Sequence, residues 1–507
     1  MMTMDKTTTS VMLSDLLQQW VSLPVDMDCE ISGITQDSRT VKPGNLFLAC
    51  KGQTVDGAEY IDAAIEKGAR AIIWQPDEEA APIAFSSRKS NQGNDIPLIA
   101  FAGLIDKAGL IAAQFYNQPS RDMFVTGITG TNGKTSCSHF LAQALNDSEV
   151  TGIIGTLGNG LYGQLEEATH TTPDAVTCQK WLAKMHDAGA KNVAMEVSSH
   201  ALDQGRVTGV EFDCAVFTNL TRDHLDYHGD MESYLQSKQK LFVYPSLKYA
   251  VINMDDDAGS SIRKVVPESV KVITYGLNGS HGQVDVYADD ICLDRNGLKL
   301  NVNTPWGSGE LRSQLMGRFN ISNLLAVLSV LLLNGMKLET ALERLSKVQG
   351  VAGRMQCIAI EGKPLVVIDY AHTPDALKHV LDALHEHSKD NIWCVFGCGG
   401  NRDQGKRAQM GVIAESLASK VVITTDNPRT EDPQAIVKDI CEGLKTPSAV
   451  HVELDRAQAI DYALGNADED DIVLVAGKGH ENYQEVNGKR YPFSDFATVQ
   501  QYLGVNA

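Results

Sequence analysis

The sequence has 507 residues, of which 43% are hydrophobic and 21% charged, and its formal net charge is −20 at pH 7. Because a single hydrophobic core seldom grows beyond about 250–300 residues, this length predicts two to four domains. The acidic balance argues against nucleic-acid binding, so an anionic small ligand would need local Lys and Arg groups. The sequence shows no apolar tract of membrane-spanning length and no signal segment, so we expect a cytoplasmic protein without membrane insertion.

The ten cysteines are scattered singly, which excludes a disulfide scaffold and is typical of free thiols in a reducing compartment. Cys394 and Cys398 have a spacing that a metal pair could use. The apolar strand expected before Cys398 favours buried thiols instead.

The order of the expected elements predicts an α/β protein with three domains. Residues 1–118 show short strands at 31–35, 45–49 and 71–74 around one or two helices, which predicts a small N-terminal α/β domain. Within it, the segment Asp37–Phe47 is a strand-like stretch that contains a Pro-Gly turn.

From residue 119 to 345, short apolar strands alternate with helices, a pattern typical of a mostly parallel sheet. The strands are expected at 124–126, 192–197, 214–218 and 249–253. The segment 260–313 predicts an added β excursion, and a helix at 320–333 closes this central domain.

The alternation restarts near residue 346 and predicts a second doubly wound domain over 346–507. Its strands are expected at 365–369, 392–397, 421–425, 451–454 and 472–476. Polar loops occupy 369–375, 396–407, 425–432 and 476–481. Because the carboxyl ends of parallel strands meet at one edge of a sheet, these four loops predict a binding face.

The most informative segment is Val125-Thr-Gly-Ile-Thr-Gly-Thr-Asn-Gly-Lys-Thr-Ser136, between an expected strand and an expected helix at 135–145. Such a loop turns several backbone N–H groups toward one point, where the helix N-terminus adds positive partial charge. Lys134 would reach the outer phosphates of a nucleotide, and the Thr135 hydroxyl would be available to Mg²⁺. Ile128 stands where the strict pattern has glycine, so we interpret the segment as a variant phosphate loop.

Polar side chains also follow the central strands. Glu196 ends an apolar strand, where it would either bind Mg²⁺ or cap a helix. The segment Asn219–His228 contains two histidines and two aspartates, for which zinc is conceivable but Mg²⁺–phosphate chemistry suits the setting better. A solvated loop is the alternative for Asp226 and His228.

These features together indicate a class of reaction. A phosphate loop, candidate Mg²⁺ ligands and a separate binding domain suit activation of a carboxylate as an acyl phosphate, followed by attack of an amine. The sequence contains neither a Gly-x-Ser-x-Gly elbow nor a kinase His-Arg-Asp loop.

Over essentially its full length the chain resembles the ATP-dependent Mur ligases of peptidoglycan synthesis. The matching pieces are Gly130–Thr135, Glu196–Ser199, Asn219 with Asp223 and His224, Gly317–Asn323, Gly353–Arg354, Asp369–His372 and Asp426–Arg429. The resemblance implies an N-terminal domain for a UDP-linked substrate, a central P-loop-type ATPase domain and a C-terminal Rossmann-like domain for an amino acid. It implies ATP and Mg²⁺ as cofactors.

The resemblance also implies roles for individual residues. It implies nucleotide binding by Gly130, Thr131, Asn132, Gly133, Lys134, Thr135, Ser136, Asn320, Asn323, Arg354 and Asp369. It implies metal sites formed by Thr135, Glu196, His224 and Lys238, with Lys134, Glu196, His224 and Lys238 catalytic. It implies that Ser38 and Gln53 meet the uridine end, and that Thr171, Thr172, Ser198, Gln204 and Arg206 line a muramoyl-dipeptide.

Lys238 matches the lysine that is carbamylated in this family, a modification that turns a cation into an anion able to position Mg²⁺. A surface lysine is the alternative, and spacing alone does not exclude the neighbouring Lys240.

The resemblance implies addition of meso-2,6-diaminopimelate to the D-glutamyl γ-carboxylate of UDP-N-acetylmuramoyl-L-alanyl-D-glutamate. Arg429 can grip the second carboxylate, which lysine lacks, with two charge-assisted hydrogen bonds of ~1.5–3 kcal/mol. The expected amino-acid pocket comprises Arg402, Asp426, Asn427, Pro428, Arg429, Gly477 and Glu481. We expect a monomer.

Two alternatives share this chemistry: a lysine-adding ligase and the folylpolyglutamate synthetases. Arg429 counts against the first, and the element around Pro43-Gly44 counts against the second. A non-catalytic, nucleotide-gated binding protein is a third alternative. It predicts loss of a phosphate-loop or metal residue, whereas Lys134, Thr135 and Glu196 are all present.

Overall fold

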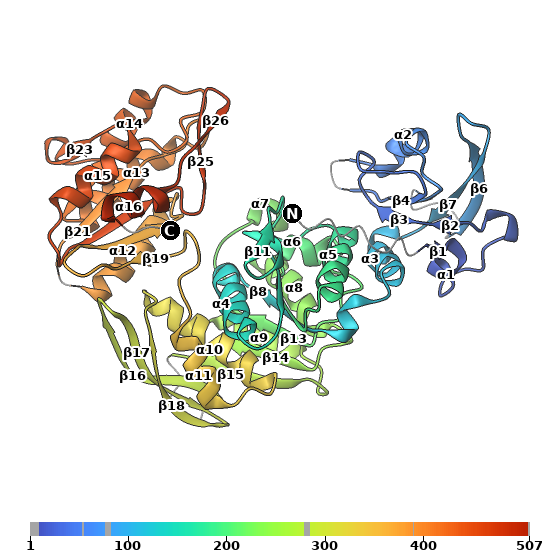
Figure 1. The fold of residues 1–507 in the computed structure, drawn as a ribbon, viewed down its shortest axis with the longest axis horizontal. Coiled ribbons are helices and arrows are strands. Elements are labelled where there is room, and N and C mark those ends of the chain that lie inside the picture. The colour runs from blue at the N-terminus through green and yellow to red at the C-terminus, as the bar shows by residue number, and fades with distance from the viewer. Residues whose placement is uncertain (1–9, 53–54, 77–82, 278–283, 389, 505–507) are drawn as a thin grey trace. The chain divides into compact units, whose positions relative to one another are not determined.

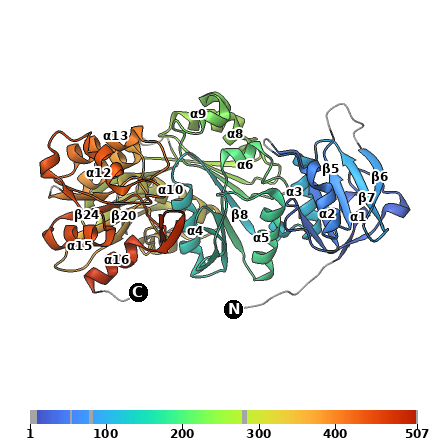
Figure 2. The same ribbon diagram turned by 90° about the horizontal axis from the view of Figure 1, so that it is seen from above.

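A computed structural model describes the chain at residues 10–52, 55–76, 83–277, 284–388 and 390–504 (Figures 1 and 2). It has the predicted α/β class, and the chain divides into two compact units, residues 1–274 and 275–507. Within the described residues, no helix combines the length and the apolar character that crossing a membrane requires.

The first unit begins with a five-stranded sheet of order β3-β4-β5-β7-β6, in which only β6 is antiparallel to its neighbour. Its region comprises β1 (Val11–Met12), α1 (Leu13–Leu17), η1 (Val25–Met27), β2 (Glu30–Ile31), β3 (Gly33–Thr35), β4 (Asn45–Ala49), η2 (Gly57–Tyr60), α2 (Ile61–Glu66), β5 (Ala71–Trp74), β6 (Ile83–Lys89), β7 (Asp95–Phe101) and α3 (Leu104–Phe115). Side chains of a strand alternate between the two faces. Leu46 and Ile73 therefore pack with α1 and α3, whereas Phe47 and Ile72 pack with α2.

The strands β6 and β7 were not predicted from the sequence. β6 is an edge strand whose residues after Ile83 are exposed, so it shows no buried alternation that a pattern could reveal.

A second sheet follows in the first unit, with strand order β11-β10-β9-β12-β8-β13-β14-β15. Its region comprises η3 (Pro119–Asp122), β8 (Phe124–Thr129), α4 (Lys134–Asn146), β9 (Thr151–Gly155), β10 (Gly158–Leu161), β11 (Gln164–Glu166), α5 (Ala175–Asp187), β12 (Asn192–Glu196), α6 (Ser199–Asp203), β13 (Cys214–Phe217), α7 (Leu225–His228), α8 (Met231–Gln239), η4 (Lys240–Val243), β14 (Tyr249–Asn253), α9 (Asp257–Val265) and β15 (Lys271–Gly276). The strands β9, β12, β8, β13 and β14 are parallel, which confirms the predicted, mostly parallel sheet and adds β9 to the strands predicted for it.

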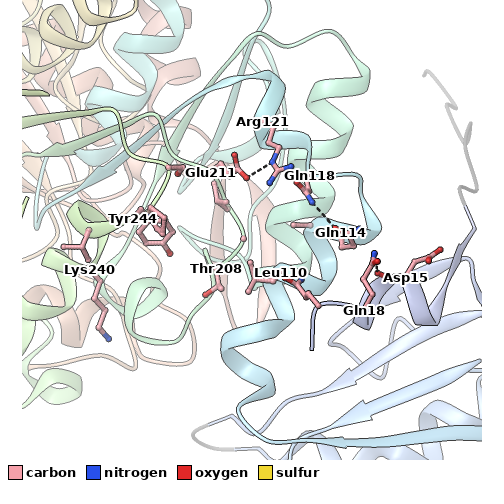
Figure 3. Close-up of a pocket in the computed structure, with 17 residues that line it drawn as sticks. Asp15, Gln18, Leu110, Gln114, Gln118, Arg121, Thr208, Glu211, Lys240 and Tyr244 are labelled. Carbon is pink, nitrogen blue, oxygen red and sulfur yellow. Dashed lines mark hydrogen bonds and ion pairs between the residues drawn. The ribbon is translucent and has the colours of Figure 1, made fainter. Parts of the chain in front are cut away.

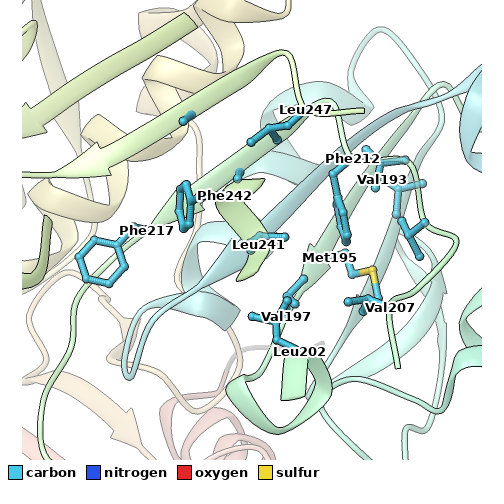
Figure 4. Close-up of a cluster of buried hydrophobic side chains, with 14 of the residues drawn as sticks. Val193, Met195, Val197, Leu202, Val207, Phe212, Phe217, Leu241, Phe242 and Leu247 are labelled. Carbon is cyan, nitrogen blue, oxygen red and sulfur yellow. The ribbon is translucent and has the colours of Figure 1, made fainter. Parts of the chain in front are cut away.

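The core on one face of this sheet contains large side chains such as Phe212, Leu241 and Phe242, all fully buried (Figure 4). Burial of apolar area at about 25 cal/mol per Å² makes this cluster a main source of the sheet's stability. The register pairs Glu196 on β12 with Ile128 on β8, so the carboxylate lies beside the strand from which the phosphate loop leaves.

The second unit opens with the predicted β excursion, three antiparallel strands in the order β16-β17-β18. This part comprises β16 (Val286–Asp294), β17 (Gly297–Thr304), β18 (Gly307–Ser313), α10 (Arg318–Leu333) and α11 (Leu338–Ser346). The helix α10 confirms the helix predicted at 320–333; it is apolar on nearly all sides and is buried from Ile321 onward except at Ser322.

The remainder of the second unit is built around a six-stranded sheet of order β19-β20-β24-β21-β22-β23, in which the strands are parallel except for β19. It comprises β19 (Gln356–Ile358), β20 (Leu365–Asp369), α12 (Pro374–His387), β21 (Ile392–Phe396), α13 (Gly405–Leu417), β22 (Lys420–Ile423), α14 (Pro433–Cys441), η5 (Pro447–Ala449), β23 (His451–Val452), α15 (Arg456–Asn466), β24 (Ile472–Ala476), β25 (Tyr483–Val486), β26 (Lys489–Pro492) and α16 (Asp495–Leu503). One core packs α12, α13 and α14 on the sheet, and a second packs α15 and α16 on the other face. The predicted doubly wound domain is confirmed.

A buried ion pair joins α15 to α16. Arg456 and Asp495 are both fully buried and form two hydrogen bonds, of 2.7 and 2.8 Å. The same guanidinium donates to the carbonyl of Ala476 at 2.9 Å, at the end of the central strand β24. Two opposite charges satisfied in this way avoid the desolvation cost that either would bear alone.

We predict that Arg456→Met destabilises the fold by ~3–5 kcal/mol, because Asp495 would remain buried without its partner. Urea unfolding followed by circular dichroism measures this change. The double variant Arg456→Met/Asp495→Asn should recover part of the loss. The exposed pair of Arg312 with Glu310 provides the control, since Arg312→Met should move the unfolding midpoint little. An unchanged midpoint for Arg456→Met would contradict the prediction.

Candidate functional site

The predicted phosphate loop connects β8 to α4 and is tied to the segment after β13. Asn132 donates its backbone N–H to Asn219 Oδ1 at 2.9 Å, and its carbonyl accepts from Thr218 Oγ1 at 2.6 Å. Gly130 approaches this segment so closely that an added Cβ would lie 1.9 Å from Thr218 Oγ1, and Gly133 begins α4 with a φ of 86°. Only glycine suits both positions, so the loop is held in one conformation.

The key contact of the loop joins Thr135 to Glu196. The Thr135 hydroxyl donates to Glu196 Oε2 at 2.8 Å, and both residues are buried. Thr156, after β9, adds its backbone N–H to Oε1 at 2.9 Å and its hydroxyl to Oε2 at 3.1 Å. Burial raises the pKa of Glu196, while the Thr156 N–H and the Lys134 charge oppose that rise.

The alternative role of Glu196 as a helix cap is wrong, because Ser198 caps α6 by accepting from Ala201 N at 3.2 Å. The Lys134 ammonium folds back over the loop and donates to the carbonyls of Gly130 and Thr131 at 2.7 and 2.9 Å. It would have to leave these carbonyls to reach an outer phosphate.

Lys238 lies on α8 and is 1% exposed, so the surface alternative is wrong for this residue. Its ammonium lies 4.3 Å from the centroid of the Tyr234 ring, and Tyr234 Oη is 3.1 Å from Thr131 Oγ1 in the loop. Burial, aided by the charge of Lys134, lowers the pKa of Lys238 to about 6. Lys240 is half exposed and pairs with Asp203 at 2.8 Å.

His224 adopts a left-handed backbone conformation, with φ of 53°, and its Nε2 lies 3.3 Å from Asp223 Oδ2. Its ring lies 6.0 Å from that of Tyr234, which places it on the same side of α8 as Lys238. The His228 ring forms a hydrogen bond with the Ser199 hydroxyl at 3.0 Å, so His228 is not part of a solvated loop, whereas Asp226 is exposed.

The side chains around the loop fit Mg²⁺ better than zinc. Thr135 and Glu196 supply a hydroxyl and a carboxylate, which are oxygen donors of the kind that Mg²⁺ prefers. No group of three His, Cys, Asp or Glu side chains within the described residues is arranged to hold a metal. A carbamate on Lys238 would supply a further anionic oxygen donor. Cys394 and Cys398 are buried in the core of the second unit, as predicted.

Five residues predicted to line the muramoyl-dipeptide form one connected network in the first unit. Arg206 donates to Gln204 Oε1 at 2.9 Å and to the Thr172 carbonyl at 3.1 Å. Thr172 Oγ1 donates to the Glu196 carbonyl at 2.8 Å and lies 3.4 Å from Ser198 Oγ. Thr171 meets Thr156 at 3.1 Å. The network is therefore attached directly to the strand that carries Glu196.

Of the two residues predicted for the uridine end, the structure describes Ser38. Ser38 is partly buried, and its carbonyl accepts from Lys67 Nζ at 2.9 Å. Gln53 lies outside the described residues.

Four of the residues predicted to bind the nucleotide belong to the second unit. Their contacts in the structure are mainly with neighbouring parts of the chain. Asn320 and Asn323, in the first turns of α10, bond to each other at 3.0 Å. Asp369 accepts from the backbone N–H groups of Met355 and Ala371, each at 2.8 Å. Burial raises the pKa of Asp369, and these two N–H groups with the Arg354 charge oppose that rise. Arg354 lies 5.3 Å from the Tyr370 ring centroid.

The predicted amino-acid pocket is assembled by the loops after β22 and β24. Asn427 Nδ2 donates to Glu481 Oε2 at 2.8 Å. An added Cβ on Gly477 would lie 2.6 Å from Asp426 Oδ2. Burial raises the pKa of Asp426, and the charges of Arg456 and Lys478 oppose that rise.

Arg429 is held in a strained and partly exposed position. Its φ is 52°, its Nη1 donates to the Gly400 carbonyl at 2.7 Å, and its Nε lies 3.5 Å from Glu485 Oε2. A left-handed non-glycine residue costs ~1–3 kcal/mol and persists where the surroundings impose it, often at functional sites. Arg402 is exposed and has no hydrogen-bond or ion-pair partner among the described residues, so its guanidinium is available to bind an anion.

The first unit contains a cavity of about 1040 Å³ (Figure 3). It is lined by parts of α1, α3, the segment 208–211 and the segment 243–246, and by the ion pair of Arg121 with Glu211. None of the predicted site residues lines it. The candidate site is therefore identified by the chemistry of its side chains and not by the size of a cavity.

Sequence reasoning missed Thr156, Tyr234 and Lys478. Thr156 follows β9, a strand that was not predicted from the sequence, so its position beside Glu196 could not be inferred. Lys478 lies between two glycines directly after an apolar strand, which was a usable signal.

The fold and the site together define a phosphate-loop α/β protein with a doubly wound C-terminal domain. Three family descriptions match the chain: "Mur ligase family, catalytic domain" at residues 30–116, "Mur ligase middle domain" at 128–331 and "Mur ligase, glutamate ligase domain" at 353–479. The chain belongs to the Mur ligase family, and it has the family's three-domain architecture.

Curated relatives are similar over nearly the whole chain. A UDP-N-acetylmuramoyl-L-alanyl-D-glutamate–2,6-diaminopimelate ligase from Chromobacterium violaceum is 50% identical over 492 residues, covering 96% of each protein. The Pseudomonas aeruginosa ligase of the same name is 48% identical, covering 94% of this chain and 96% of the relative. A solved structure with that name is 35% identical, with a TM-score of 0.71, and covers 94% of this chain and 95% of its own.

We predict that Lys238, and not Lys240, forms a carbamate with CO₂, because a buried lysine with a lowered pKa is largely the neutral amine at pH 7.5. The measurement is ¹³C NMR of the protein with ¹³C-labelled bicarbonate and Mg²⁺. Lys238→Met should abolish the carbamate signal, and Lys240→Met should keep it. A signal that survives Lys238→Met would contradict the assignment.

Proposed function

We propose that this protein is an ATP-dependent ligase that joins meso-2,6-diaminopimelate to the D-glutamyl γ-carboxylate of UDP-N-acetylmuramoyl-L-alanyl-D-glutamate. The observation that carries the proposal is the contact of Thr135 with Glu196, which joins the phosphate loop to the strand that also holds the predicted dipeptide network. Relatives of that name at 48–50% identity support the choice of reaction. All residues assigned to the proposed reaction belong to one chain, so a monomer would be sufficient to catalyse it.

The proposed nucleotide is ATP, bound by the loop residues 130–136. The backbone N–H groups and Lys134 would hold the phosphates, with the N-terminus of α4 beneath them. Thr135, Glu196, His224 and a carbamylated Lys238 would hold Mg²⁺, which when bound supplies positive charge near the transferred phosphoryl group.

The proposed reaction has two steps. In the first, an oxygen of the D-glutamyl γ-carboxylate attacks the γ-phosphorus of ATP, and the bond from this phosphorus to the β-phosphate oxygen breaks. ADP is released, and the γ-carboxylate has become an acyl phosphate. In the second, the amine of diaminopimelate attacks the acyl carbon, inorganic phosphate leaves, the amine loses its proton and an amide forms. Arg206, Gln204 and Thr172 would orient the dipeptide so that its carboxylate meets the phosphate.

The choice of amino acid depends on charge. Arg429 and Arg402 offer two cations to the carboxylates of diaminopimelate, and Asp426 and Glu481 offer two anions to its ammonium groups. Lysine lacks the second carboxylate, so it would make one charge-assisted contact fewer with these cations. This favours diaminopimelate over the lysine-adding alternative. The intact set of Lys134, Thr135 and Glu196 counts against a non-catalytic binding protein.

We predict that Glu196→Gln lowers phosphate release by about a hundredfold or more, because the variant loses a negative oxygen ligand while keeping its shape. Release is measured with ATP and both other substrates present. Glu211→Gln, which alters an exposed carboxylate of the same unit, is the matched control and should retain activity. Full activity of Glu196→Gln would contradict its assigned role.

We predict that the unmodified protein prefers meso-diaminopimelate to L-lysine in kcat/KM, and that Arg429→Lys reduces this preference by about 10- to 100-fold. The reason is the loss of a two-point, charge-assisted contact of ~1.5–3 kcal/mol. Phosphate release with each amino acid gives both ratios.

The KM for ATP is the internal control for that variant and should stay unchanged. Equal turnover of the two amino acids by the unmodified protein would remove the argument from Arg429 and leave a ligase of broader specificity. Release with neither amino acid would contradict the proposed function.

A further inference from the structure

Lys478 is a fully buried lysine that neither the phosphate loop nor the dipeptide network uses. It lies in the loop Gly477–Glu481, which follows the central strand β24. A lysine with no exposed area normally requires partners that repay its desolvation. The identity of these partners indicates its role.

The ammonium of Lys478 makes two polar contacts, both to predicted residues of the amino-acid pocket. Its Nζ donates to Glu481 Oε2 at 3.0 Å and to Asn427 Oδ1 at 3.2 Å. Its third neighbour is the ring of Tyr483, with the centroid 5.5 Å away. The charge of Lys478 therefore acts directly on the predicted pocket.

These contacts hold Glu481 in a defined orientation. Lys478 and Asn427 Nδ2 both donate to Glu481 Oε2, and Oε1 has no hydrogen-bond partner among the described residues. One oxygen is thus anchored, and the other remains available to a donor. Asn427 is fixed in turn, because its Oδ1 also accepts from Glu485 N at 2.8 Å.

Lys478 also sets the charge of this part of the pocket. Asp426 and Glu481 are two carboxylates on adjacent loops, and Lys478 opposes the charge of both. Arg456, which also lies near Asp426, is already paired with Asp495. Lys478 therefore offsets part of the negative charge of these two carboxylates, and the charge that remains attracts an ammonium group of a ligand.

We propose that Lys478 is a positioning residue for the amino-acid substrate: it anchors Glu481 and Asn427 so that they receive an ammonium group of the incoming amino acid. This inference rests on the proposed function, because Glu481 and Asn427 are assigned to the pocket there. Without Lys478, the Glu481 carboxylate would have one anchor fewer and would have to be ordered again at each binding event.

The test is steady-state phosphate release with Lys478→Met, varying each of the three substrates in turn. We expect the KM for meso-diaminopimelate to rise by about tenfold or more, the size of a lost charge-assisted hydrogen bond. The KM values for ATP and for the UDP-linked dipeptide should stay within about twofold, because their predicted sites do not contact Lys478. Lys438→Met, at an exposed lysine of α14, is the matched control and should leave all three values unchanged.

A double-mutant cycle separates positioning from a general structural role. If Lys478 acts through Glu481, then Lys478→Met added to Glu481→Gln should raise the KM for the amino acid by less than about twofold further. The double variant removes both charges, so it also tests the inference if Lys478→Met alone folds poorly. Additive effects, an unchanged KM in Lys478→Met, or an equal rise in all three KM values would overturn the inference.

The unmodified protein keeps the two proposals distinct. If it releases phosphate in a meso-diaminopimelate-dependent manner while the Lys478 variants behave as the unmodified chain does, only the inference about Lys478 fails. If the unmodified protein shows no such release, the proposed function fails, and the inference fails with it.

Discussion

The hydrogen bond from Thr135 to Glu196 is the contact on which the candidate site depends. Thr135 is in the first turn of α4, and Glu196 is the last residue of β12, a strand beside β8 in the sheet. A parallel register places the end of β12 next to the point where the phosphate loop leaves β8. The dipeptide network begins at the carbonyl of the same Glu196, so one strand end orders two predicted subsites.

Charge compensation without solvent is a second constraint, and it operates in the second unit. Lys478 is paired with Glu481, and Arg456 is paired with Asp495. A buried charge persists only when its partners are in place. These two cations therefore fix the positions of the groups around them, whereas burial of Lys238 in the first unit lowers its pKa. This explains how loops, which are usually the more variable parts of a fold, can present functional groups in defined positions.

Much of the architecture followed from periodicity and from strand-end chemistry. The strands β8, β12, β13 and β14, and the C-terminal strands β20, β21, β22 and β24, were predicted because buried parallel strands are short apolar runs. The strands β6, β7, β9, β10 and β11 were not predicted. β6 is an exposed edge, and β10 with β11 forms a glycine-containing antiparallel extension, so these three strands lack the apolar run of a central strand. The domain limits at 118 and 346 stay predictions.

The sequence by itself determined the phosphate loop, the α/β class, the parallel sheets and the identity of most candidate residues. These features depend on local patterns of side chains and glycines, which are read along the chain. Only the tertiary structure decided that Lys238 is buried while Lys240 is exposed, that Glu196 accepts from the Thr135 hydroxyl while Ser198 caps α6, and that Lys478 anchors Glu481. The physical reason is that burial and pairing depend on residues distant in the sequence, which the packing of strands and helices brings together.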